Sequence, residues 1–217
     1  MMKTGKIFGY GFSAAVIAGS VWAIFNTQSI IDWWRLRDYE PSPEISRLAT
    51  DAFLSDEGRR LFYIHDPELL TKDEFQGKCS NNEETIVLGC YITHEKIYVF
   101  DVEEERLEGV EEVTAAHEML HAVYDRLSEE ERERIDRITA DYFNASTDER
   151  LIRTIENYRN RDPSVVPNEL HSILGTEIAD IPQELVDHYD EYFLDRDGVV
   201  AIAEAYEADF TQLEEQI

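Results

Sequence analysis

Residues 113–124 read Val-Thr-Ala-Ala-His-Glu-Met-Leu-His-Ala-Val-Tyr, and this stretch decides the fold. Glu118 is its only charged residue, so a helix formed here is apolar on almost every side and is expected to be buried. His117 and His121 are four residues apart and therefore project from the same side of that helix. The sequence thus predicts a core built around one helix that carries two adjacent imidazoles.

The spacing of the two histidines suits a metal ion. Two imidazoles placed this way can take two corners of a tetrahedral zinc site. Glu118 lies beside them and can accept a proton from a water molecule whose pKa zinc lowers to about 7. A buried lone carboxylate is costly unless something compensates its charge, which a metal ion does. The alternative is a pair of core histidines satisfied by hydrogen bonds, with Glu118 at the edge of the helix.

Segment 113–124 resembles the active-site helix of the zincin metallopeptidases, which have uncharged residues around His-Glu-x-x-His. The metzincin branch does not match, because Tyr124 and Leu127 stand where that branch continues with a glycine and a third histidine. The gluzincin branch, in which a glutamate on a later helix is the third ligand, matches better. The resemblance implies a Zn²⁺ cofactor bound by His117 and His121, with Glu118 as the catalytic base. It also implies a strand edge that receives an extended peptide.

The later helix is expected over residues 168–181, where the resemblance is weaker. Its apolar stripe consists of Leu170, Ile173, Leu174, Ile178 and Ile181. Glu177 lies on this stripe, where a carboxylate needs a partner such as zinc, so Glu177 is the preferred third ligand. Glu169 falls on the polar side near the helix start, and Glu169 and His171 are the alternatives.

Other residues of this helix add to the expected site. Gly175 removes a side chain near Glu177 and would let the helix approach the zinc helix closely. Gluzincins carry an acid four residues after the ligand glutamate, but Ile181 stands there, and Asp180 is a candidate substitute. His171 is expected to donate a hydrogen bond to the oxyanion of the reaction, as a catalytic residue. The alternative is a histidine on the helix surface or at a helix cap. Further candidate donors are Tyr158, Tyr189 and Tyr192, although tyrosines at helical spacing are more often core residues. His65 and His188 are expected to be structural or surface residues.

Upstream of the zinc helix, β-branched and aromatic residues predict a hairpin. Its strands are expected over 85–92 and 96–102, with a turn at 93–95. Residues 44–75 are expected to form one or two short helices and an extended piece around 61–65. The two cysteines, Cys79 and Cys90, are expected to form a disulfide in an oxidising compartment, the alternative being two reduced core thiols.

Downstream of residue 102 the chain is expected to be helical to its end. Ser128 and Glu131 form one capping box, and Ser146 and Glu149 form another, so each pair marks a helix start. Three further helix boundaries are indicated by Pro167, Pro182 and Gly198. The fold class is therefore α+β and predominantly helical, as the zincin resemblance also implies.

The first 31 residues differ from the rest of the chain in their charge and hydropathy. Lys3 and Lys6 precede a charge-free run over 7–31, and roughly 20 apolar residues suffice to cross a bilayer. The preferred interpretation is a transmembrane anchor over 7–25, with interfacial aromatics at its far boundary: Trp22, Trp33 and Trp34. The lysines place the N-terminus in the cytoplasm. A cleaved signal peptide and a buried core helix are the alternatives.

The whole chain carries a net charge of −27, and every acidic residue lies after residue 31. Such an acidic surface repels phosphate backbones, so no nucleic-acid partner is expected. The predicted organisation is a cytoplasmic terminus and anchor over 1–31, a juxtamembrane linker over 32–45, and an extracytoplasmic zincin-like domain over 46–217.

The leading functional hypothesis is a single-pass membrane protein that acts as a zinc-dependent endopeptidase outside the cytoplasm. Its partners are the membrane and a protein or peptide substrate. The alternative is a catalytically inactive zincin-like ectodomain that serves as a binding or sensor module. A third possibility, a cytosolic domain of opposite topology, predicts free thiols at Cys79 and Cys90.

Overall fold

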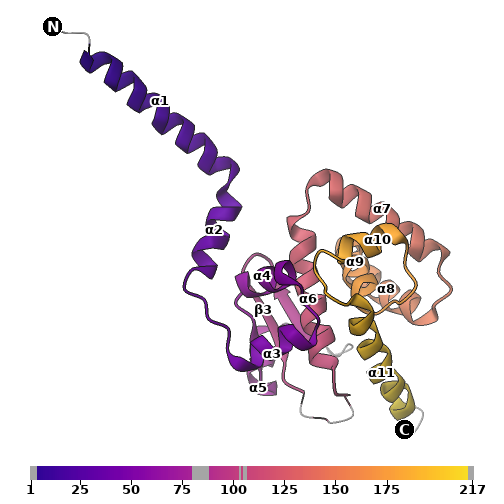
Figure 1. Ribbon diagram of the computed structural model, residues 1–217. Helices are drawn as coiled ribbons and strands as arrows, with labels where there is room; N and C mark the ends of the chain where they lie inside the picture. Colours follow the sequence, from indigo (N-terminus) through magenta and orange to yellow (C-terminus); the bar gives the residue numbers. More distant parts are fainter. Residues whose placement is uncertain (1–3, 80–87, 103, 105–106, 215–217) are drawn as a thin grey trace. The chain divides into compact units, whose positions relative to one another are not determined.

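The computed structural model describes residues 4–79, 88–102, 104 and 107–214 (Figure 1). The chain divides into two units, Met1–Glu40 and Pro41–Ile217. The described residues form eleven helices and one three-stranded sheet. The prediction of a predominantly helical α+β chain is therefore confirmed.

The first unit contains α1 (Thr4–Phe25) and α2 (Thr27–Leu36). Although the expected anchor over 7–25 is helical, no helix in the described part of the chain is long and apolar enough to cross a membrane. The structure thus gives no support to the transmembrane segment. The expected linker over 32–45 also differs, because its first residues continue α2 and its last residues begin the next helix.

The second unit contains all the remaining elements. In chain order these are α3 (Pro43–Asp51), α4 (Asp56–Ile64), β1 (Glu68–Leu70), α5 (Lys72–Lys78), β2 (Gly89–Ile92), β3 (Lys96–Phe100), α6 (Val110–Arg126), α7 (Glu129–Ala145), α8 (Glu149–Arg161), α9 (Val166–Thr176), α10 (Gln183–Tyr189) and α11 (Arg196–Glu214).

The sheet has the order β1-β3-β2, in which β3 pairs parallel with β1 and antiparallel with β2. The predicted hairpin is present as β2 and β3, with the expected turn between them; residues 85–87 of its first strand lie outside the described residues. His94 takes the left-handed conformation that this turn needs, with φ of 58°. The extended piece expected around 61–65 is instead the end of α4, and the strand follows it at Glu68–Leu70. β2 lies at an edge of the sheet.

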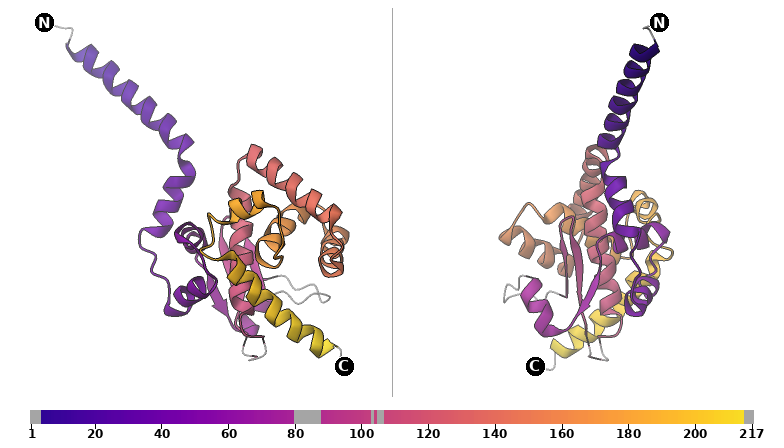
Figure 2. Two further views of the ribbon diagram at one scale, coloured as in Figure 1. Left: turned by 45° about the vertical axis from the view of Figure 1, so that its right-hand side comes forward. Right: turned by 90° about the vertical axis from the view of Figure 1, so that its left-hand side faces the viewer.

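Helix α6 forms the centre of the second unit, as its apolar sequence predicts. It lies along the sheet (Figure 2) and contacts β2, β3, α3, α4, α9 and α11. Its alanines and leucine are fully buried: Ala115, Ala116, Ala122 and Leu120. Because short side chains face several neighbours, β2 and α9 can both approach the helix, and its histidine face lies between them.

The expected disulfide between Cys79 and Cys90 is confirmed. It joins the end of α5 to the edge strand β2, next to the buried side chains of Leu70 and Phe75. Closing a loop of this length stabilises a fold by about 3 kcal/mol. The cross-link therefore fixes β2 to the end of α5.

Three of the expected helix boundaries lie elsewhere in the structure. The last helix, α11, begins at Arg196, so Gly198 lies in its first turn instead of preceding it. The capping box of Ser128 and Glu131 starts α7 as predicted. The start of α8 is capped by Asp148 instead of Ser146, because the Asp148 carboxylate accepts hydrogen bonds from the backbone N–H groups of Arg150 and Leu151.

The later helix is also shorter than expected, since α9 ends at Thr176. The buried guanidinium of Arg196 donates to the carbonyl oxygens of Leu174, Ile178 and Ala179. These bonds satisfy carbonyl oxygens that have no donor within the helix at its C-terminal end. Glu177 is therefore a C-cap residue and does not lie on a helical stripe.

Gly175 lies where α9 crosses α6. A Cβ at this position would come within 2.3 Å of Leu120 Cδ1 and 2.9 Å of Tyr189 Cε1. We expect Gly175→Ala to lower the free energy of unfolding by about 1–3 kcal/mol in urea denaturation, because the helices must move apart. The matched control is Gly77→Ala in α5, where a Cβ meets nothing within 4 Å, so that change should be neutral or slightly stabilising. Equal effects of the two changes would contradict close packing at Gly175.

Candidate metal centre and active-site cleft

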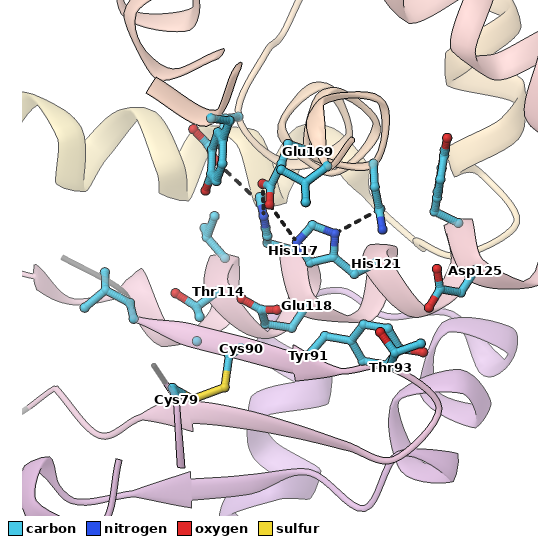
Figure 3. A pocket seen from close by; sticks show the side chains of 18 of the residues that line it. Cys79, Cys90, Tyr91, Thr93, Thr114, His117, Glu118, His121, Asp125 and Glu169 are labelled. Atoms are coloured by element: carbon cyan, nitrogen blue, oxygen red, sulfur yellow. Dashed lines mark hydrogen bonds and ion pairs between the residues drawn. A yellow bond between two sulfur atoms is a disulfide. The ribbon is translucent and has the colours of Figure 1, made fainter. Parts of the chain in front are cut away.

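The side chains of His117 and His121 leave α6 side by side and face α9 (Figure 3). Their ring centroids are 4.7 Å apart. The Nε2 atoms of His117 and His121 lie 3.6 Å and 3.9 Å from the two carboxylate oxygens of Glu169, on the first turn of α9. One ligand atom of each of the three residues lies within 4.8 Å of the others. The three side chains therefore form a group that could hold a metal ion.

The chemistry of this group fits a cation. Oε2 of Glu169 is buried and has no hydrogen-bond partner among the described residues. A buried oxygen of this kind is costly unless a positive group faces it. Ligand atoms around tetrahedral zinc, with bonds of about 2.0–2.1 Å, lie about 3.3 Å apart, close to the two distances from Glu169. Two imidazoles and one carboxylate are also a donor set that catalytic zinc sites use.

Glu177, the third ligand preferred from the sequence, is not part of this group. As the C-cap residue of α9 it approaches the other side of His117, with Oε1 3.8 Å from Nδ1. Its second oxygen, Oε2, accepts a hydrogen bond of 2.7 Å from Arg150, which also pairs with Glu207 of α11. Glu169, one of the alternatives from the sequence, therefore stands with the two histidines where Glu177 was expected, and Glu177 lies outside this group against His117 and Arg150.

His121 is oriented by residues of α9. Its Nδ1 lies 2.9 Å from Oδ1 of Asn168 and 3.1 Å from the hydroxyl oxygen of Ser172. The amide oxygen of Asn168 can only accept, so Nδ1 of His121 carries the proton and donates it. The lone pair of His121 is then on Nε2, the atom that faces Glu169, as metal binding requires.

Glu118 lies between α6 and β2, next to the two histidines (Figure 3). A Cβ on Gly89 would come within 2.8 Å of Oε1 of Glu118 and 2.5 Å of Thr114 Cγ2, so this strand position leaves room for the carboxylate. Burial raises the pKa of Glu118, and the charges of His121 and His117 and a backbone hydrogen bond from Tyr91 oppose that shift only in part. A carboxylate with a raised pKa is a better proton acceptor near neutral pH. Sequence reasoning did not single out Gly89, although a glycine inside a predicted strand is a signal of close approach.

The charge balance of the group also favours a cation. Burial disfavours the protonated form of His117, yet contact with Glu169 and the charges of Glu118 and Glu177 together raise its pKa to about 9. The three carboxylates thus stabilise positive charge at this place. A dication would supply that charge without protonating the imidazole.

Of the expected oxyanion donors, Tyr158 lies at the site and His171 does not. Tyr158 of α8 lines the cleft close to Glu169. Burial raises the pKa of Tyr158, as do the charges of Glu169 and Glu118, so the hydroxyl keeps its proton. Tyr189 and Tyr192 are buried outside the cleft.

His171 is fully buried on the other side of α9, and its Nε2 lies 2.9 Å from Nε2 of His188. Its ring packs against the rings of Tyr124 and Tyr189. The expected role of His171 as a donor is therefore corrected: it belongs to the core. His65, for which a structural role was expected, is likewise fully buried, with Nδ1 2.9 Å from the carbonyl oxygen of Leu61.

The group opens into a cleft of about 600 Å³. One wall is the edge strand β2, the floor is the histidine face of α6, and the opposite wall comes from α8, α9 and α11. An elongated ligand could therefore lie between β2 and the three candidate metal ligands.

No protein-family model, curated protein or solved structure matches this chain.

Proposed function

We propose that the chain is a zinc-dependent endopeptidase of the gluzincin-like kind, in which His117, His121 and Glu169 hold the metal and Glu118 is the general base. The observation that carries the proposal is the carboxylate of Glu169, whose two oxygens each face one imidazole nitrogen and whose Oε2 is buried with no hydrogen-bond partner among the described residues. A structural histidine pair would not need a carboxylate in this position. A metal site does, and the adjacent base makes the site suited to hydrolysis.

The protein side chains have separate tasks in this reaction. Zinc held by His117, His121 and Glu169 would supply Lewis acidity toward the peptide carbonyl and would lower the pKa of water to about 7. Glu118 accepts that proton and later returns it to the leaving amine. Tyr158 keeps its proton and can donate a hydrogen bond to the developing oxyanion. Glu177 and Asn168 hold the rings of His117 and His121 in the required orientation.

The edge position of β2 supports a peptide as the substrate. Within the described sheet, β2 pairs only with β3, and its residues 89–91 line the cleft. An extended chain can pair with the open side of such a strand by backbone hydrogen bonds. Pairing of this kind would hold a scissile bond alongside α6, where Glu118 and the metal group lie.

We also propose that the catalytic unit works outside the cytoplasm. The Cys79–Cys90 disulfide supports this location, because such bonds persist in oxidising compartments. A membrane anchor in the N-terminal unit is part of the same proposal, and it rests on the charge-free run of the sequence alone.

The direct test combines metal analysis with a peptidase assay on the wild-type protein. We expect one zinc ion per chain, hydrolysis of an unstructured protein substrate such as casein, and loss of that hydrolysis with a chelator such as 1,10-phenanthroline. Activity should return when zinc is added back. Bound zinc without any hydrolysis would favour the binding or sensor module, and protein purified without metal that also fails to take up added zinc would reject the metal site.

A further inference from the structure

One carboxylate of the cleft has no task in the proposed reaction. Asp125 follows His117 and His121 on α6 at the same four-residue interval, so the three side chains form one row along the cleft. Figure 3 shows Asp125 beyond His121, next to Thr93 at the end of β2. It is therefore placed to meet a substrate residue near the scissile bond.

The carboxylate of Asp125 lies near Tyr91 of β2. The hydroxyl oxygen of Tyr91 accepts a hydrogen bond of 2.9 Å from the backbone N–H of His94. Burial is the main cause that raises the pKa of Tyr91 to about 12, and the charge of the nearby Asp125 adds to it. Oδ2 of Asp125 is buried without a hydrogen-bond partner in the described part of the chain. The carboxylate thus lines the cleft with an unsatisfied oxygen.

The other acids of the cleft are already engaged. Glu169 faces the two histidines, Glu118 lies against β2, and Glu177 is bound by Arg150. Near Asp125, the guanidinium of Arg132 donates to the backbone carbonyl oxygens of Tyr124 and Asp125 and lies over the Tyr124 ring. Among described residues that line the cleft, Arg161 is the one lysine or arginine, and it stacks on Tyr158 at 5.3 Å. Asp125 is therefore the carboxylate that remains for a ligand.

The position of Asp125 along α6 determines how many substrate residues separate its partner from the scissile bond. Four residues of helix rise about 6 Å, which is the axial separation of His121 and Asp125. An extended peptide advances about 3.3 Å per residue, so Asp125 lies about two residues from the metal group. We infer that Asp125 forms a subsite for a basic side chain, lysine or arginine, within two residues of the scissile bond. This inference rests on the proposed peptidase function.

A peptide series can test the subsite. Neutral peptides carry a single lysine at each position in turn, and in the matched peptides norleucine replaces that lysine, which removes the charge while nearly keeping the length. For the wild-type protein we expect one position within two residues of the cleaved bond at which lysine raises kcat/KM about tenfold, mainly through KM. In Asp125→Asn the ratio should fall to about one, while cleavage of the norleucine peptide changes less than twofold. The amide has nearly the shape of the carboxylate, and the Tm of the variant verifies the fold.

The charge-matched control is Asp141→Asn, on the exposed surface of α7 outside the cleft. It lowers the net negative charge equally and should keep the lysine preference, which separates contact from long-range attraction. An unchanged lysine preference in Asp125→Asn would overturn the inference.

Binding measurements separate this inference from the peptidase proposal. Fluorescence anisotropy of the same labelled peptides is measured on the zinc-loaded Glu118→Gln protein with and without Asp125→Asn. If no peptide is cleaved by the wild type but lysine still tightens binding about tenfold through Asp125, the peptidase proposal fails and the subsite stands. If cleavage occurs and neither rate nor binding depends on Asp125, the subsite fails and the peptidase proposal stands.

Discussion

Glu118→Gln is expected to lower kcat for peptide hydrolysis by about 10²–10⁴-fold, which is the usual contribution of a general base. The amide has nearly the shape of the carboxylate and can still accept the hydrogen bond from the Tyr91 backbone. It cannot accept a proton from water, so the chemical step fails while the site remains assembled. Zinc content should stay at one per chain, because Glu118 lies outside the group formed by His117, His121 and Glu169.

The same substitution should leave the free energy of unfolding unchanged or raise it slightly. Burial raises the pKa of Glu118, so its charged form is less stable in the folded protein than in the unfolded chain at neutral pH. The amide removes that cost. Glu133→Gln, on the exposed face of α7, is the control and should keep full activity. Hydrolysis at the wild-type rate by Glu118→Gln would remove Glu118 from the mechanism.

The position of α6 could be predicted because its sequence allows one interpretation. A stretch with Glu118 as its single charge can only be buried, and the four-residue spacing of His117 and His121 is a local property of any helix. The disulfide could be predicted equally well, because the chain has two cysteines and they allow one pairing. Both predictions depend on nearby residues or on elimination, and neither requires the arrangement of distant elements.

The partner of the histidines could not be found by the same reasoning. An apolar stripe identifies the buried face of a helix only when the other faces are exposed. In α9 all residues from 170 to 176 are buried, because α6, α7, α8 and α11 pack around it. The stripe of Leu170, Ile173 and Leu174 therefore did not point at the metal group. His171 was misplaced for the same reason, since a buried position on this helix need not face the cleft.

Strand β1 and the C-cap of α9 were missed for a related reason. Three residues, Glu68–Leu70, are too short to show an alternating pattern, and they form a strand only because β3 lies beside them. Likewise, α9 ends at Thr176 with its last carbonyls bound by Arg196, some twenty residues later in the chain. Contacts between distant residues determine both features.

Zinc affinity distinguishes the roles of the two glutamates that compete for the third ligand position. Glu169→Gln is expected to abolish stoichiometric zinc binding at micromolar concentrations, with a loss of more than about 10²-fold, because it removes a charged ligand. Glu177→Gln is expected to weaken binding by about 10–100-fold and still allow one zinc per chain when zinc is in excess. The difference follows from the geometry: Glu169 faces the Nε2 atoms of both histidines, whereas Glu177 faces only Nδ1 of His117.

Competition against a chromophoric zinc chelator measures both affinities. The wild type and Glu184→Gln serve as references, since Glu184 lies exposed at the start of α10.

The Glu169→Gln and Glu177→Gln variants should also differ in activity. With saturating zinc, Glu177→Gln should recover most of its hydrolysis, because its effect is on retention and orientation of the metal ligand. Glu169→Gln should recover little at any accessible zinc concentration. If instead Glu177→Gln lost the metal and Glu169→Gln kept it, the ligand set would be His117, His121 and Glu177, and the assignment of Glu169 as the third ligand would be wrong.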